Sequence, residues 1–241
     1  MIFPAIDIQG GQSVRLYQGQ FNQETLVSSN PIKQAKKINA KQIKCLHLVD
    51  LDGAKAGSPQ NFAIVKSICQ TFKGLVEIGG GIRSVKTIER YLQLGISRVI
   101  LGSAALKNPV FTKQAIKQFG SAKVVIGVDG RDGKVATEGW LDQSEITMVT
   151  LITEMIKAGA QNFIVTDVSR DGTMVGPNIK LLQGLQQEFP QANIIASGGV
   201  RNFTDIKKLQ IAGIKDIVVG KALYEGTITL KEVSEVNAYA C

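Results

Sequence analysis

Two aspartates, Asp7 and Asp129, have the residue type and the setting for acid–base chemistry. Each ends an apolar run, in the segments FPAIDIQGG and VVIGVDGRDG, and each precedes a loop that contains glycine. A carboxylate beside a buried strand is costly unless it is hydrogen-bonded or used. Two such groups facing one substrate can act as general acid and general base if one keeps its proton near neutral pH. Either aspartate alone is equally consistent with capping its own loop, but the matched pair favours catalysis.

Two glycine motifs occur twice along the chain. GGGIRS is followed by VILGSAA in the first half, and SGGVRN is followed by IVVGKAL in the second. Gly80 recurs as Gly198 and Gly102 as Gly220, both 118 positions later. Each motif pair is typical of a glycine turn that opens a helix, followed by a strand that ends in glycine, which is a setting for binding a phosphate through backbone N–H groups.

The repeat predicts two phosphate sites. The first predicted phosphate site consists of Gly80, Gly81, Gly102 and Ser103, and the second consists of Gly198, Gly199, Gly220 and Lys221. Glycine lets the backbone approach an anion closely, and a serine hydroxyl adds a donor. One glycine pair alone is more often a plain turn. Two pairs at matched spacing indicate a substrate with a phosphate at each end.

Three arginines are candidates for binding an anionic substrate. Arg83 and its counterpart Arg201 follow the two glycine turns, where they either reach the substrate or lie on the surface at a helix start. Arg15, in the segment SVRL, offers a cationic contact from the first loop.

The second half adds polar and aromatic candidates. Thr166 and Asp167 precede the loop SRDGTMVG, which ends at Gly176, and Thr166 is placed to orient a substrate hydroxyl or a carboxylate. We count Asp167 and Gly176 among the predicted substrate contacts. Trp140 is the only tryptophan of the chain. It suits stacking on a planar heterocycle, and packing its own loop down is an equal alternative.

These residues need a scaffold that brings strand ends together. Continuous apolar runs, rather than alternating ones, are typical of parallel strands covered on both faces. Eight such runs, each followed by a helical pattern, predict a (β/α)8 barrel in preference to an open doubly wound sheet. The helical patterns include Ser84–Leu94 and Phe203–Ala212. The predicted strands are Ile2–Asp7, Cys45–Leu51, Leu75–Gly79, Arg98–Leu101, Lys123–Asp129, Asn162–Asp167, Asn193–Ser197 and Asp216–Val219.

The repeat also predicts how the barrel is organised. LVDLDGAKAGSPQN parallels VTDVSRDGTMVGPN, so that Asp50 corresponds to Asp167 as Asp7 corresponds to Asp129. We therefore expect one domain over residues 1–241, built from half-repeats of about 1–121 and 122–241. All four aspartates then lie at the carboxyl ends of strands, where barrel active sites are built.

Composition narrows the class of protein. The net charge of +8, from 28 basic and 20 acidic residues, is spread over the 241 residues, and aromatic residues are few, which argues against nucleic-acid binding. No apolar run approaches the roughly 20 residues of a membrane span. The three cysteines lack metal-ligand or redox spacing, and the single histidine, His47, is more consistent with a hydrogen-bonded core residue than with a catalyst. We expect a cytoplasmic protein without a metal.

The motifs together resemble a known family. IDIQGGQSVRLYQG, LHLVDLDGAKAG, EIGGGIRS, GVDGRDGKVATEGW, TDVSRDGTMVGPN and ASGGVR are similar, over essentially the whole chain, to the phosphoribosylformimino-5-aminoimidazole carboxamide ribotide (ProFAR) isomerases of histidine biosynthesis. The resemblance implies an Amadori rearrangement of an aminoaldose to an aminoketose. It also implies a bis-phosphorylated ribotide substrate, no cofactor and, we expect, a monomer.

The resemblance also assigns roles. Asp7 resembles the general base of the family and Asp129 its general acid, with Thr166 orienting, Trp140 stacking on the imidazole and Arg83 binding substrate. Pseudosymmetry alone would allow either order of acid and base. Three alternatives stay open: the related cyclase subunit of imidazole glycerol phosphate synthase, an isomerase that also accepts phosphoribosylanthranilate, and a barrel that binds phosphate ligands without catalysis.

Overall fold

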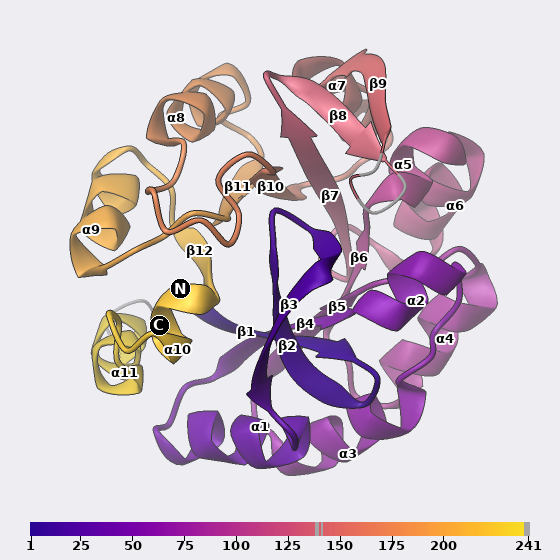
Figure 1. Ribbon diagram of the computed structural model, residues 1–241. Helices are drawn as coiled ribbons and strands as arrows, with labels where there is room; N and C mark the ends of the chain where they lie inside the picture. The colour runs from indigo at the N-terminus through magenta and orange to yellow at the C-terminus, as the bar shows by residue number, and fades with distance from the viewer. Residues whose placement is uncertain (138–139, 141, 239–241) are drawn as a thin grey trace.

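The predicted strands form a closed parallel barrel (Figure 1). In the computed structural model, which describes residues 1–137, 140 and 142–238, every barrel strand pairs in parallel with both neighbours, and β1 closes the ring against β12. The (β/α)8 barrel is confirmed, and the open sheet is excluded because an open sheet would leave two edges unpaired. The barrel strands are β1 (Ile2–Gln9), β4 (Cys45–Asp50), β5 (Leu75–Gly79), β6 (Arg98–Leu101), β7 (Val124–Arg131), β10 (Asn162–Asp167), β11 (Asn193–Ser197) and β12 (Asp216–Val219).

Amphipathic helices surround the barrel and bury the outer faces of its strands (Figure 1). The predicted helices Ser84–Leu94 and Phe203–Ala212 are confirmed to within one residue at each end, as α4 (Val85–Gln93) and α9 (Phe203–Ile211). In both, a side chain at the N-cap accepts a backbone N–H of the first turn. The other outer helices are α1 (Pro31–Ala40), α3 (Phe62–Thr71), α6 (Pro109–Phe119), α7 (Met148–Lys157), α8 (Ile179–Glu188) and α11 (Leu230–Ala238).

Three short helices follow barrel strands at the end where the predicted site residues lie. They are α2 (Leu51–Ala56), α5 (Ser103–Lys107) and α10 (Lys221–Tyr224). Gly102 and Gly220 are the N-cap residues of α5 and α10. The two strand-end glycines of the predicted phosphate sites therefore each begin a helical turn.

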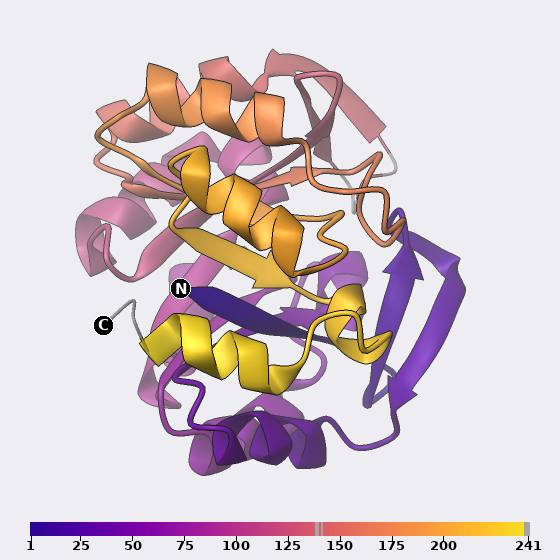
Figure 2. The same cartoon turned by 90° about the vertical axis from the view of Figure 1, so that its left-hand side faces the viewer.

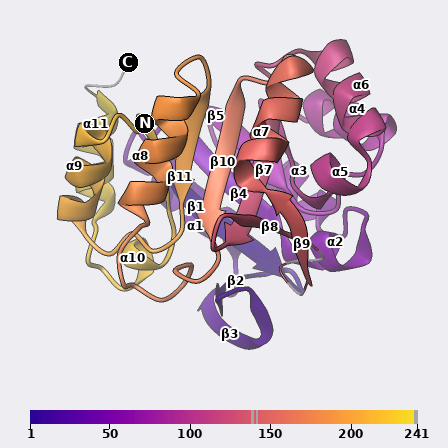
Figure 3. The ribbon, with the colours of Figure 1, turned by 90° about the horizontal axis from the view of Figure 1, so that it is seen from above.

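Two antiparallel hairpins stand where the sequence suggested only loops. β2 (Gln12–Tyr17) pairs with β3 (Gln20–Ser28), and β8 (Lys134–Thr137) pairs with β9 (Asp142–Thr147). The β2–β3 hairpin extends beyond one end of the barrel, as Figures 2 and 3 show. Most residues of β3 are exposed, so this strand has no apolar face that a sequence pattern could reveal. Both hairpins follow a strand that ends near a predicted catalytic aspartate.

The described residues lack two features, a membrane-spanning helix and a metal-binding cluster. None of their helices combines the length and the apolar character needed to cross a membrane. Within the same residues, no three or more histidine, cysteine, aspartate or glutamate side chains are grouped so that they could hold a metal ion.

Candidate active site

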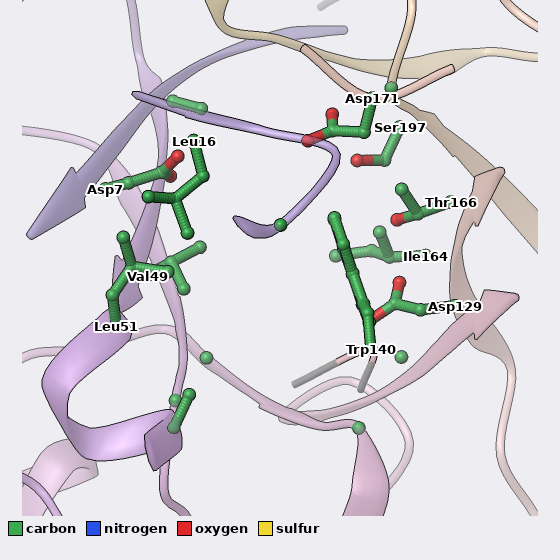
Figure 4. Close-up of a pocket in the computed structure, with 18 of the residues that line it drawn as sticks. Asp7, Leu16, Val49, Leu51, Asp129, Trp140, Ile164, Thr166, Asp171 and Ser197 are labelled. Carbon is green, nitrogen blue, oxygen red and sulfur yellow. The ribbon is translucent and has the colours of Figure 1, made fainter. Parts of the chain in front are cut away.

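A cavity of about 250 Å³ opens at the carboxyl ends of the barrel strands. Asp7 enters it from β1 and Asp129 from β7, and three barrel strands separate β1 from β7 in either direction around the ring. The two carboxylates therefore face each other across the cavity (Figure 4). The alternation of side chains along each strand explains their orientation, since Ala5 and Gly127, two positions earlier, also line the cavity.

Asp7 forms an ion pair with Arg15. The Nη1 atom of Arg15 donates to Oδ2 of Asp7, and its Nη2 atom donates to the backbone oxygen of Ala5 at 2.6 Å. Arg15 lies on β2, which folds back along β1 so that Val14 is opposite Asp7. The hairpin therefore positions Arg15, which the sequence predicted as a contact from the first loop, beside Asp7, the predicted base.

Asp129 lies in a different environment. Trp140 Nε1 donates to Oδ2 of Asp129 at 3.0 Å, and Thr166 lies beside Asp129 in the register of β7 and β10. Burial raises the pKa of the Asp129 carboxyl, and this effect outweighs the opposing hydrogen bonds from Thr166 and Trp140 and the influence of His47. A carboxyl with a raised pKa retains a proton more readily, as a general acid must.

A third carboxylate, Asp171, lines the same cavity and was not among the sequence-based candidates (Figure 4). Burial, together with the negative charges of Asp7 and Asp129, raises its pKa to about 6, and Arg15 acts in the opposite direction. Asp171 follows β10 by four residues in a polar loop, where an aspartate is typical of a turn. The sequence feature that could have pointed to Asp171 is the loop SRDGTMVG, a long polar segment that follows a strand.

The glycine motifs of both halves converge on the cavity. All four residues of the first predicted phosphate site line it, and so do all four of the second. The two sets enter from β5–β6 and from β11–β12, so they lie on different sides of the ring. Gly102 has open space where a Cβ would stand, whereas a Cβ on Gly220 would lie 2.6 Å from Cζ of Arg15. The two predicted sites therefore differ in what surrounds them.

Two basic side chains of the prediction also reach the cavity. Arg83 lines it and is exposed, and its guanidinium lies against Gly57 at the end of α2. Lys221 donates from Nζ to the backbone oxygen of Gly172 at 2.9 Å, which joins α10 to the loop after β10. Arg201, the counterpart of Arg83, instead forms a bidentate ion pair with Asp205 on the outer helix α9.

Asp167 and Gly176 do not line the cavity. The Asp167 carboxylate accepts from Ser169 N and Oγ and from Asn178 Nδ2, so it ties down the loop after β10. Gly176 N donates to the oxygen of Gly199 at 3.0 Å. In the first half, Asp50 binds Asn61 in the same way, at 2.8 Å. These positions organise the loops around the cavity rather than lining it.

His47 is hydrogen-bonded in the barrel interior, as the sequence suggested, but it also lines the cavity floor. Its Nδ1 atom lies 2.8 Å from Oε1 of Glu77, and Arg98 donates to Oε2 of the same buried carboxylate at 2.6 Å. This chain of polar groups satisfies Glu77, which is fully buried.

Three loops meet above the cavity. The turn of the β2–β3 hairpin contains Gln18 and Gly19, both at positive φ, as in a two-residue type I′ turn. Gln18 donates from its backbone to Asp171 O at 3.1 Å and from Nε2 to Ser169 O at 2.8 Å. The indole of Trp140 packs directly on Gly19. The mouth is thus narrowed by contacts between segments far apart in the sequence.

Fold and cavity together define a (β/α)8-barrel protein with three carboxylates and two sets of glycine turns around one cavity. A model of the family described as histidine biosynthesis protein matches residues 1–229. The chain belongs to this family.

Curated relatives cover nearly the whole chain. A protein of Lactiplantibacillus plantarum is 56% identical over 237 residues, which are 98% of this chain and 99% of the relative. A protein of Leuconostoc mesenteroides is 52% identical over 98% of this chain and all of the relative, and one of Bacillus cereus is 45% identical over 98% of both. All three are named 1-(5-phosphoribosyl)-5-((5-phosphoribosylamino)methylideneamino)imidazole-4-carboxamide isomerase. The family resemblance read from the motifs is confirmed.

Proposed function

We propose that the protein is an isomerase of histidine biosynthesis that converts the aminoaldose ProFAR into its aminoketose by an Amadori rearrangement. The observation that carries the proposal is the pair of carboxylates on opposite sides of one cavity, in unlike environments. Asp7 is ion-paired with a guanidinium, whereas Asp129 accepts a hydrogen bond from Trp140 and has a raised pKa. Unlike environments are what allow two carboxylates to serve as base and acid in one reaction.

The chemistry needs an acid first and a base second. Asp129 donates its proton to the ribose ring oxygen, the C1–O bond breaks, and the substituent nitrogen forms a Schiff base with C1. Asp7 then removes the proton on C2, and the electron pair forms the C1–C2 double bond of an enolamine. Protonation at C1 and loss of the C2 hydroxyl proton give the ketone. Thr166 orients Asp129, and Trp140 is placed to stack on the imidazole once the substrate displaces it from that carboxylate.

The substrate has a phosphate at each end, which fits the two predicted phosphate sites. Gly80, Gly81, Gly102 and Ser103 bind one phosphate, and Gly198, Gly199, Gly220 and Lys221 bind the other, with Arg83 as a further cation. The same cavity holds both sets of residues, which supports this placement. The reacting ribose then lies between them, within reach of both aspartates.

The direct test is an assay of the purified protein with the ribotide substrate. We expect isomerisation by the wild type, and a fall in kcat of roughly 100-fold or more in Asp7→Asn and in Asp129→Asn. No turnover by the wild type would reject the function, and full activity in either variant would reject that residue's role. Asp171→Asn belongs in the same series because Asp171 also lines the cavity with a raised pKa. A larger loss there than in Asp129→Asn would transfer the acid role to Asp171.

Separate measurements would identify each of the three alternatives, two related activities and one non-catalytic role. Conversion of the aminoketose and ammonia to imidazole glycerol phosphate would indicate the cyclase. Turnover of phosphoribosylanthranilate would indicate a dual-specificity isomerase. Tight binding of the ribotide without product would indicate a binding protein. A monomer in the cytoplasm that binds neither nucleic acid nor membranes stays a prediction, which light scattering, cell fractionation and binding assays test.

A further inference from the structure

Tyr224, the last residue of α10, contacts the arginine that pairs with the predicted base. Its ring lies under the guanidinium of Arg15, with Cζ 5.2 Å from the ring centroid. This distance is within the range of a cation–π interaction, which strengthens when both groups are shielded from water. The Arg15 side chain is only 14% exposed. The ring therefore contacts the positive charge of Arg15 in a setting that is largely shielded from water.

The β12–α10 segment forms a slot for the Arg15 guanidinium. The ring of Tyr224 lies against the guanidinium, and Gly220, where a Cβ would come within 2.6 Å of Cζ, leaves room for it. The Nε atom of Arg15 is buried without a hydrogen-bond partner. The guanidinium is therefore held by Asp7, by the oxygen of Ala5 and by Tyr224, through both its ring and its hydroxyl.

The hydroxyl of Tyr224 fixes the ring itself. It donates to the oxygen of Ala5 at 2.5 Å and accepts a hydrogen bond from Nε2 of Gln34, on helix α1. The oxygen of Ala5 also accepts from Arg15, and Ala5 lies two residues before Asp7 on β1. Burial raises the pKa of Tyr224, so the hydroxyl remains a donor. One carbonyl thus links the ring, the guanidinium and the strand that carries Asp7.

We propose that Tyr224 is a positioning residue for the isomerase reaction: it holds Arg15 in the geometry that orients the Asp7 carboxylate toward the substrate. The inference rests on the proposed function and adds a residue that touches neither Asp7 nor the reacting atoms. An arginine side chain has many rotamers, so without the slot it would sample orientations that leave Asp7 unsupported. Small displacements of a catalytic group have large effects on rate.

The test compares four single variants and one double variant by steady-state kinetics. Tyr224→Leu removes the ring and should lower kcat about tenfold, whereas Tyr224→Phe keeps the ring and should retain most of the activity. Phe203→Leu is the matched control, because Phe203 also lies under a cation at 5.2 Å, that of Lys207, but outside the site. Its kcat should equal that of the wild type even where its Tm falls. Arg15→Ala completes a double-mutant cycle with Tyr224→Leu, and Tyr224→Leu should add no loss in the Arg15→Ala background.

A second readout does not depend on turnover. Asp171 is influenced by Asp7 from β1, by Asp129 from β7 and by Arg15 from β2, and of these only Arg15 lowers its pKa. Release of the guanidinium should therefore raise the pKa of Asp171 above about 6 in Tyr224→Leu, as followed by carboxyl NMR. Tyr224→Phe, which keeps the ring, should raise it less, and Phe203→Leu should leave it unchanged. If Tyr224→Leu does not fold, the flexible Tyr224→Met takes its place.

The outcomes separate the two proposals. An inactive wild type would reject the isomerase, while the Asp171 titration would still decide whether Tyr224 positions Arg15. Unchanged kcat and unchanged titration in Tyr224→Leu would overturn the inference. Additive losses in the cycle would also overturn it, because Tyr224 would then act independently of Arg15.

Discussion

At the scale of single residues, the contrast between the two opposed aspartates lies in their partners. Asp7 has a guanidinium beside it, and Asp129 has two neutral donors, Thr166 and Trp140. Neutral donors lower a carboxyl pKa less than a cation does, so burial determines the direction of the shift at Asp129. The same strand position in two halves of the barrel thus has a cation beside it in one half and neutral donors in the other.

Replacing Thr166 by valine should make Asp129 a weaker acid. The hydroxyl of Thr166 lowers the pKa of Asp129, so its removal leaves burial less opposed and the pKa rises further. A general acid must be protonated to act, so the alkaline limb of the pH–rate profile should move to higher pH in Thr166→Val. Thr112→Val, which loses an equally buried hydroxyl on the outer helix α6, is the control and should leave the limb in place. A limb that moves to lower pH would contradict the role of Thr166.

Asp171 should reduce the stability of the fold above about pH 4. Its folded-state pKa of about 6 lies above its ordinary value of 3.8, so the folded state binds the proton more tightly than the unfolded state. Stability is therefore lost as pH rises from about 4 to about 6, and the loss is constant above that. Asp171→Asn removes it, and its Tm should exceed that of the wild type by roughly 5 °C at pH 7 and by little at pH 4. Thermal unfolding at both pH values checks this, and an equal gain at pH 4 would contradict it.

Which site residues the sequence could predict depends on their position in the elements. Asp7 and Asp129 each lie two residues before the end of a largely buried strand, where a charge is conspicuous. Asp171 lies inside a polar loop, where an aspartate is not conspicuous in the sequence. It becomes a candidate only because the loop folds back so that Asp171 lines the cavity. Asp167 resembles Asp129 in sequence, yet its carboxylate is turned to its own loop by Ser169 and Asn178. Ile164 and Thr166, on the same strand, line the cavity, so the alternation of side chains along β10 turns Asp167 away from it.

At the scale of elements, the β2–β3 hairpin and Trp140 depend on each other. A Cβ at Gly19 would collide with the six-membered ring of Trp140, and Gly19 also has a φ of +72°. Gly19→Ala should therefore displace the indole from Asp129 and shift the emission of this sole tryptophan to longer wavelength, with a loss of activity. Gly10→Ala has the same kind of backbone strain, at a φ of +55°, but no neighbour within 4 Å. It should leave the emission unchanged, and an equal shift in both variants would contradict the contact.

The barrel strands could be predicted closely, but the two hairpins could not. Strands such as β6 are buried along their whole length, so their apolar residues run without interruption. β3 is mostly exposed and reads QFNQETLVS, in which neither face is consistently apolar. It is held by backbone pairing to β2 and by contacts of its turn with the loop after β10. Such tertiary contacts between distant segments leave no local periodicity.

At the scale of the whole molecule, the two halves share a framework but differ around the cavity. Asn61 binds Asp50 as Asn178 binds Asp167, and both sets of glycine turns line the cavity. These matched contacts support the predicted half-repeats. The differences lie beyond the framework: the hairpin after β1 brings Arg15, and the segment after β7 brings Trp140. We expect these unlike hairpins to orient a substrate with similar ends.

This asymmetry predicts different effects at two equivalent glycines. A Cβ at Gly102 meets no atom within 4 Å, so Gly102→Ala should fold normally and only occupy space proposed for a phosphate. We expect its KM to rise about tenfold with kcat and Tm near those of the wild type. At Gly220 the added methyl group would displace the guanidinium of Arg15, so Gly220→Ala should also lower kcat. Steady-state kinetics with the ribotide distinguish the two patterns, and equal effects at both positions would mean that Gly220 serves phosphate binding alone.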